Sequence, residues 1–184
     1  MSTSMNDQQD WIAAAQEIMG LIADNVPAIQ FIDLWAEQTD FPEDEYPFPL
    51  PAVFLEFNAQ KIDDLGENVQ DLTTEVKVYL LFIPTGDTHQ SGKGNGDLSA
   101  FGALLRDLYK LLQGTAGDNF SQLSRVAMAR EKAAPFEWCY SQTFSGLIRD
   151  YAACKTFEEE DPGDLSVEKG GIPATTQDDT YDFT

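Results

Sequence analysis

TTEVKVYLLFI (residues 73–83) is the stretch that decides the fold class, because its side chains alternate between apolar and polar. One face would carry Val76, Val78, Leu80 and Phe82, and the other Glu75, Lys77 and Tyr79. A period of two is typical of a β-strand that buries one of its faces. We therefore expect a strand here, in a sheet with one side toward a core.

The segment before this strand predicts its partner. Residues 52–58 (AVFLEFN) form a second apolar run, and a polar stretch that contains Asp63, Asp64 and Gly66 separates the two. Asp and Gly are common in turns, so we expect the turn in this stretch. The natural pairing is an antiparallel hairpin, and such a hairpin can be long and project from the domain.

An amphipathic helix is predicted over residues 7–25, followed by a strand. Trp11, Ala15, Ile18 and Ile22 recur at helical spacing within this segment. Residues 28–38 (AIQFIDLWAEQ) are rich in β-branched and aromatic residues, which favours a strand. The alternative is that the helix continues into them, but Pro27 argues against it.

A second helix is predicted after the Gly-rich loop PTGDTHQSGKGNGD (residues 84–97). Asp97 or Ser99 would provide its N-cap, and Gly114 marks its end. Its apolar residues are Leu98, Phe101, Leu104, Leu105, Leu108, Leu111 and Leu112. We expect this helix to pack across one face of the sheet.

Two more strands are predicted towards the C-terminus. Residues 120–132 are predicted as a strand with charged residues, for which a helix is an open alternative, and residues 138–157 as a last long strand. Residues 158–184 hold nine acidic residues against one Lys, which is typical of a flexible tail. The order αβββαββ predicts an α+β domain at residues 1–157, a mainly antiparallel sheet flanked by two helices, with an acidic tail at 158–184.

The sequence contains none of the usual arrangements of catalytic or metal-binding residues. His89 is the only histidine and lies in the Gly-rich loop, where we expect it to be exposed. SGKGNGD lacks the spacing of a phosphate-binding loop, and Asp63 with Asp64 does not match an EF-hand. Cys139 and Cys154 have no metal-like spacing, and we expect both to be small buried side chains. We therefore expect no catalytic, cofactor or metal site, although an active site of scattered carboxylates is an open alternative.

Charge is the strongest global feature, with 32 acidic and 11 basic residues and a formal net charge of −21. Such a surface repels phosphates, which makes sequence-specific nucleic-acid binding improbable. Two special uses of acidity are open: a DNA mimic, or a surface that DNA passes without adhering. Solubility is the ordinary explanation. No apolar run reaches the ~18 residues of a membrane span, and the N-terminus lacks signal-peptide features, so we expect a cytoplasmic site of folding.

The Pro-rich segment TDFPEDEYPFPLP (residues 39–51) contains three aromatic residues: Phe41, Tyr46 and Phe48. Its four prolines oppose regular backbone pairing, yet exposed aromatic side chains are costly. Either the segment folds back over its own core, or it packs on a neighbouring subunit.

The order of elements, from residue 7 to about residue 157, resembles the tail-terminator and neck (head–tail joining) proteins of tailed bacteriophages. The matching features are the opening helix, LPAVFLEFN (residues 50–58), TTEVKVYLLFI after a polar turn, and the helix LSAFGALLRDLYKLLQG (residues 98–114). In that family a small sheet is flanked by two helices, and copies form a ring, usually sixfold, at the end of the tail tube.

The resemblance implies a structural virion protein, not an enzyme, that caps the tail tube and joins it to the head. Its partners would be further copies of itself, in a hexamer, and the tail-tube and head–neck proteins. DNA would pass through the ring without binding specifically, and neither a membrane nor a cofactor would be involved. Asp63, Asp64 and Glu67 would line the channel, and Phe41, Tyr46 and Phe48 would bridge subunits. The protein would be found in the virion, after assembly in the host cytoplasm. The alternative is an acidic DNA mimic or inhibitor of a nucleic-acid-handling enzyme.

Overall fold

The computed structural model describes residues 10–36, 48–86, 89–132 and 138–155. Its elements in chain order are α1 (Trp11–Asn25), β1 (Phe31–Leu34), β2 (Ala52–Gly66), β3 (Val69–Phe82), α2 (Asn95–Leu112), β4 (Ser124–Arg130) and β5 (Trp138–Asp150). The α+β class and the order αβββαββ are confirmed, and residues 124–130 form a strand, not the alternative helix. Three strands are shorter than expected: β1, β4 and β5. The acidic tail lies outside the described residues.

The five strands form one mixed sheet in the order β1-β2-β3-β5-β4. The pairs β2–β3, β3–β5 and β5–β4 are antiparallel, as expected, whereas β1 runs parallel to β2. A parallel neighbour needs a long connection, and residues 35–51 between the two strands are long enough to provide it. The expectation of a mainly antiparallel sheet therefore holds except at this edge.

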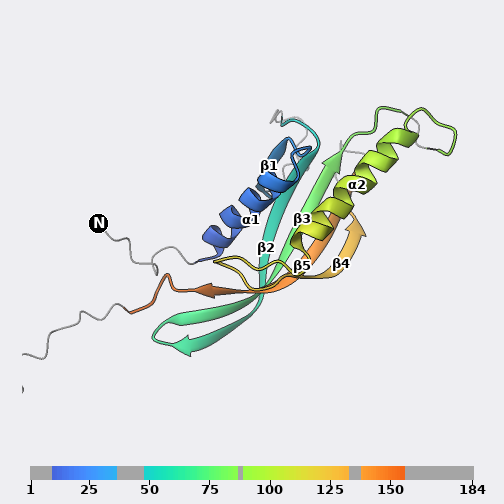
Figure 1. The fold of residues 1–184 in the computed structure, drawn as a ribbon. Coiled ribbons are helices and arrows are strands. Elements are labelled where there is room, and N and C mark those ends of the chain that lie inside the picture. The colour runs from blue at the N-terminus through green and yellow to red at the C-terminus, as the bar shows by residue number, and fades with distance from the viewer. Residues whose placement is uncertain (1–9, 37–47, 87–88, 133–137, 156–184) are drawn as a thin grey trace, which may run out of the picture.

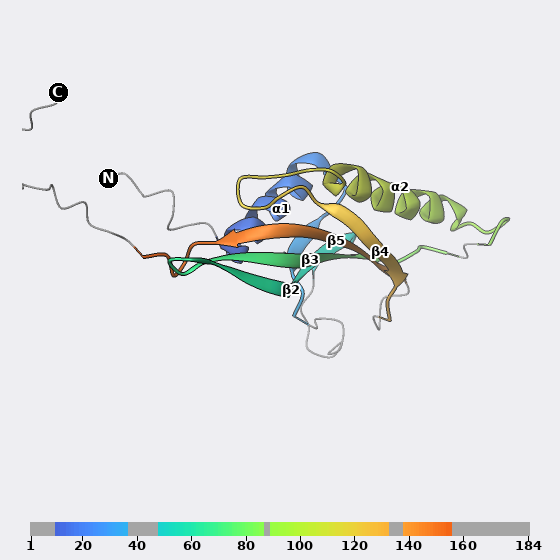
Figure 2. The same ribbon diagram turned by 90° about the horizontal axis from the view of Figure 1, so that it is seen from below.

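Both helices cover the same face of the sheet, which leaves the other face without a helix (Figures 1 and 2). The core between the layers is built from fully buried residues of all three sources: Ile18 and Ile22 of α1, Leu108 and Leu112 of α2, and Val53, Leu80 and Phe144 of the sheet. The alternation in β3 is confirmed, because Val76, Val78 and Leu80 belong to this core. In the described residues no helix is both long and apolar enough to span a membrane.

The two helices begin differently. Asp10 caps α1, since its carboxylate accepts a hydrogen bond from the Ala13 amide at 2.8 Å. The expected cap of α2 by Asp97 or Ser99 is wrong, because α2 begins at Asn95 and has no side-chain cap. Asp97 instead accepts hydrogen bonds from the Thr85 amide and hydroxyl at 2.6 and 2.7 Å, which holds the start of the preceding loop against the helix.

The β2–β3 hairpin is confirmed, but its turn lies later than expected. Asp63 and Asp64 are paired within the ladder, and the turn is made by Glu67 and Asn68. Both turn residues have positive φ, 54° and 63°, which is the signature of a two-residue type I′ turn. The polar stretch belongs to the strand because the ladder continues to Gly66, while neither helix covers this half of the hairpin and its side chains are mostly exposed.

Candidate functional site

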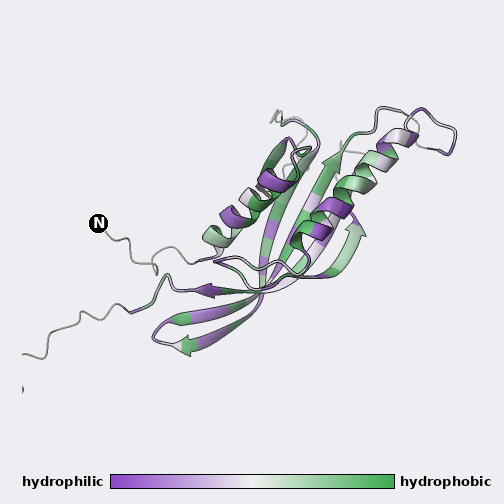
Figure 3. Ribbon diagram, in the orientation of Figure 1, coloured by the Kyte–Doolittle hydropathy of each residue, from purple (hydrophilic) through white to green (hydrophobic). Residues whose placement is uncertain are grey.

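The distal half of this hairpin forms an arm, defined here as residues 59–72 (Figure 1). The arm leads away from both helices, and Figure 3 shows hydrophilic and hydrophobic residues interleaved along it. Ile62 and Leu65 are 55% and 52% exposed, which is unusual for large aliphatic side chains. The arm therefore carries large aliphatic side chains that are more than half exposed to solvent.

The three residues predicted to line a channel all lie at the end of the arm. Asp63 pairs with Lys61 at 2.7 Å, and the Asp64 carboxylate accepts a hydrogen bond from the Gly66 amide at 2.8 Å. Glu67 is exposed in the turn. The structure therefore gathers these acids on one projecting element, and their role in a channel stays a prediction.

The β3 strand of the arm is paired with β5 almost to the turn, as far as Gln70 with Asp150. Within the described residues the arm therefore has a neighbouring strand on its β3 edge and none on its β2 edge. The Arg149 guanidinium makes two hydrogen bonds to the Asp71 carboxylate, at 2.6 and 3.0 Å. These bonds lower the pKa of Asp71 and raise the pKa of Arg149. The two parallel hydrogen bonds hold the distal part of the arm against the end of β5.

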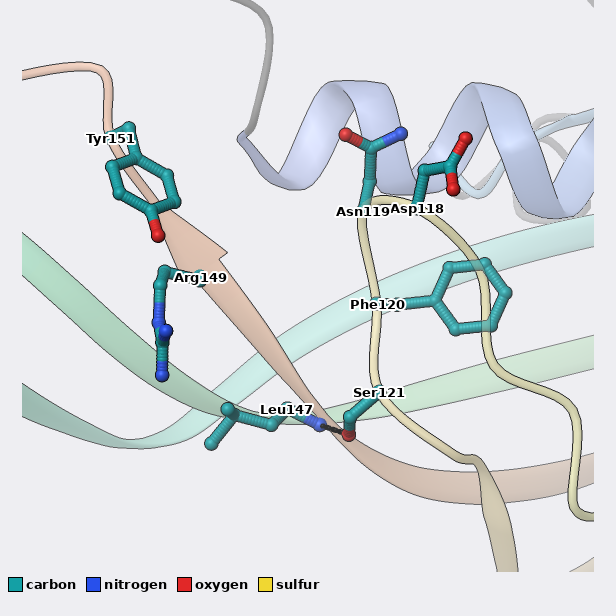
Figure 4. A pocket seen from close by; sticks show the side chains of 7 residues that line it. All are labelled: Asp118, Asn119, Phe120, Ser121, Leu147, Arg149 and Tyr151. Carbon is teal, nitrogen blue, oxygen red and sulfur yellow. Dashed lines mark hydrogen bonds between the residues drawn. The ribbon is translucent and has the colours of Figure 1, made fainter. Parts of the chain in front are cut away.

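A shallow pocket lies beside the C-terminal end of β5 (Figure 4). It is lined by Asp118, Asn119, Phe120, Ser121, Leu147, Arg149 and Tyr151. Ser121 exchanges two hydrogen bonds with the Leu147 backbone, at 2.7 and 2.8 Å, so the segment before β4 extends the edge of β5. Arg149 is the only basic residue among the described residues that line the pocket, and it is already bound to Asp71. We therefore assign no anionic ligand to this pocket.

The helix-free face carries an aromatic cluster near the start of β2. Phe48 stacks on Phe31, with ring centroids 5.4 Å apart, and meets Phe54 edge-on at 5.1 Å. Trp35 stacks on Tyr79 at 4.3 Å. Phe48 thus packs on its own sheet, as the first alternative for the Pro-rich segment expected, while Phe41 and Tyr46 lie outside the described residues.

Next to this cluster lies a polar group on the same face. Lys77 forms an ion pair with Glu131 at 2.8 Å, and the Ser141 hydroxyl donates to the same carboxylate at 2.7 Å. Burial is the largest single influence on Lys77 and would lower its pKa, but the hydrogen bonds and charges of Glu131 and Tyr79 together outweigh it, so the pKa of Lys77 is raised. Hydrogen bonds from Lys77 and Ser141 lower the pKa of Glu131. Burial, together with a hydrogen bond to Glu56, raises the pKa of Tyr79 to about 12. The group ties β3, β5 and the end of β4 together.

Residues singled out for possible chemistry lie apart from one another. His89 is exposed, and its Nδ1 accepts a hydrogen bond from the Ser91 amide at 3.3 Å. Cys139 is buried as expected, and burial raises the pKa of its thiol to about 11, whereas Cys154 is partly exposed; both are free thiols. Within the described part of the chain no three His, Cys, Asp or Glu side chains are placed to share a metal ion.

Sequence reasoning missed the two free edges of the sheet. Beyond Leu55, the outer edge of β2 has no strand beside it in the described residues, and neither has the outer edge of β4. Six of the seven residues of β4 are exposed, among them Val126 and Met128 at 56% and 51%. The missed signal is the charge of residues 124–132, where three of four charged residues are basic in a strongly acidic chain.

No family model matches the chain, and no curated protein shows significant sequence similarity to it.

Proposed function

We propose that this chain is a structural virion protein of a tailed bacteriophage, which forms a ring at the tail end or neck. In this role it caps the tail tube, joins it to the head and performs no catalysis. Its partners are further copies of itself, six in a ring, and the adjacent tail-tube and head–neck proteins. The family resemblance noted in the sequence is the source of this identification.

The observation that supports the proposal best is the arm, which projects from a domain with the element order of that family. A monomeric protein gains nothing from two long strands that leave the core with Ile62 and Leu65 exposed. An arm of this kind, together with a free sheet edge elsewhere on the same chain, is well suited to bind an identical neighbour.

The charge supports the same role. A ring through which a genome passes benefits from an acidic lumen, because like charge prevents phosphates from adhering. Asp63, Asp64 and Glu67 lie at the end of the arm, which projects from the domain, and there they can face such a lumen.

The first test is native mass spectrometry of the purified chain over a range of concentrations and salt. We expect a discrete ring-sized species, with six copies as the principal one. The matched control replaces residues 63–71 by Asn-Gly, which joins Ile62 to Leu72, a pair that already faces across the ladder. This variant should keep the cooperative thermal unfolding of the domain and lose the ring.

A chain that stays monomeric at every concentration and does not bind isolated tail tubes would contradict the proposal. If such a monomer formed a tight, salt-sensitive complex with a DNA-binding protein, the acidic DNA mimic would replace it.

A further inference from the structure

The two free edges of the sheet are complementary in charge. Residues 59–69 of the arm contain one basic residue, Lys61, and three acidic residues. Residues 124–132, which contain β4, have the reverse, with three basic residues and the single acid Glu131. In a chain of net charge −21 such a basic stretch is exceptional. Arg125 packs on the Tyr109 ring and donates to Gln142, and Glu131 is paired with Lys77, so both of these charges are already engaged within the subunit. An acidic edge and a basic edge on one chain attract each other between copies.

The edges also match in chemistry and length. β4 has seven residues, and among the described residues no strand pairs with the outer edge of β2 over a longer stretch, from residue 56 to residue 66. Each edge displays two large exposed aliphatic side chains, Val126 with Met128 on β4 and Ile62 with Leu65 on the arm. Pairing the two would satisfy backbone groups on both strands and bury all four side chains.

The outer edge of the arm and the outer edge of β4 lie on opposite sides of the sheet, with β3 and β5 between them. The arm of a chain therefore cannot reach its own β4. In a dimer joined by two unlike surfaces, each end still has one of these surfaces free. Further subunits can therefore be added until the rotation between neighbours closes a ring.

We propose that the subunits join head to tail by adding β4 of one copy to the outer edge of the arm of the next. This inference rests on the proposed function, because it names the surfaces that build the ring. The sheet would then run on from subunit to subunit, with Arg130 and Lys132 of one copy beside the acids of the neighbouring arm.

Site-directed crosslinking tests the pairing directly. The variant carries Ile62→Cys and Met128→Cys in a Cys154→Ser background, which leaves the buried Cys139 as the other thiol of the chain. A short thiol-specific crosslinker should give a ladder of covalent oligomers up to the ring. Ala23→Cys with Met128→Cys is the matched control, because Ala23 is exposed on α1, away from both edges, and should give no ladder. Dimers from Met128→Cys alone would indicate a two-fold contact and overturn the head-to-tail pairing.

Charge reversal supplies the second test. Arg130→Glu with Lys132→Glu makes both edges acidic, and Asp63→Lys with Glu67→Lys makes both edges basic. Each variant alone should associate at least roughly tenfold more weakly than the wild type, since like charges would meet. An equimolar mixture should recover assembly, because every junction can then join an acidic edge to a basic one. Unchanged circular dichroism melting of each variant shows that the domain remains folded.

The two proposals fail in different ways. A wild-type ring that persists in both charge variants, with no crosslinked ladder, would overturn the edge pairing and leave the ring intact. A wild-type chain that forms no ring would overturn the proposed function itself, and the pairing with it.

Discussion

At the scale of single residues, the loop before β4 is held by one carboxylate of α1. Glu17 accepts hydrogen bonds from the Asp118 amide at 2.8 Å, and from the amide and side chain of Asn119, each at 3.0 Å. The loop makes a tight approach at Gly117, whose amide donates to the Phe120 carbonyl at 3.0 Å. This contact joins the first helix to the segment that leads into the free edge strand.

Gly117→Ala should destabilise the domain, because an added Cβ would collide with the Glu17 carboxylate and the ring of buried Phe120. Either the three hydrogen bonds or the packing of Phe120 must give way. We expect the free energy of unfolding to fall by about 1–3 kcal/mol, as for other overpacked sites. Urea denaturation monitored by circular dichroism measures it.

Gly20→Ala is the control for this substitution. Gly20 lies within α1 with nothing within 4 Å of an added Cβ, so helix propensity should raise the free energy of unfolding by up to about 1 kcal/mol. Equal effects at the two glycines would refute the steric explanation.

At the scale of the elements, most of the fold could be predicted from periodicity. The apolar residues of α1 and α2 recur at helical spacing, and those of β3 alternate, because all three elements bury one face against a common core. This periodicity is the strongest structural signal in a single sequence. The parallel pairing of β1 could not be predicted, because it depends on a partner distant in the chain. Gln142 is a further example: this buried amide donates to the Leu105 carbonyl at 2.7 Å and accepts from Arg125 at 2.9 Å, and nothing in its sequence context indicates it.

The candidate site was less predictable than the fold for a related physical reason. An edge strand and a projecting arm are defined by what does not cover them, so neither has a strong hydrophobic period. Asp63, Asp64 and Glu67 could be picked out as a local acidic cluster, but the position of the two aspartates on a paired strand, with Glu67 in the turn, follows from the ladder with residues 69–73. The free edge of β4 follows from strand order, which the sequence does not contain.

The tie between β3 and the end of β4 should make stability depend on pH. Glu131 has a lowered pKa because Lys77 and Ser141 donate to its carboxylate. Such a group stabilises the fold above its ordinary pKa of 4.5, and this contribution is lost as the pH falls through the folded value. The free energy of unfolding of the wild type should therefore decrease more steeply between about pH 5 and pH 3 than that of Lys77→Met.

Lys110→Met is the control for that comparison, because Lys110 is an exposed lysine on α2 with no part in this group. Its pH profile should follow the wild type. Denaturation curves recorded at several pH values give the free energy of unfolding of each variant. Parallel pH profiles for the wild type and Lys77→Met would show that the ion pair adds no pH-dependent stability.

At the scale of the whole molecule, charge and shape agree with each other. The two helices and one face of the sheet enclose the core, while the arm and β4 present unlike edges on opposite sides of the sheet. Acidic residues dominate the chain, and the one basic strand lies at a free edge, where repulsion between copies would otherwise be greatest. Such a distribution favours association through one specific junction and opposes it elsewhere.

The arm has two proposed roles, in pairing with β4 and in lining a channel, and one variant separates them. Edge pairing uses backbone groups, and successive side chains of the arm point to opposite faces, so pairing still leaves carboxylates toward a lumen. Combining Asp63→Lys and Glu67→Lys with Arg130→Glu and Lys132→Glu restores an attractive junction but makes the arm basic. Phage carrying this fourfold variant should assemble complete tails, visible by electron microscopy, yet deliver DNA poorly, because lysines at the lumen would hold the phosphates. Complete tails with normal infectivity would show that the arm does not line the channel, and would still agree with its role at the subunit junction.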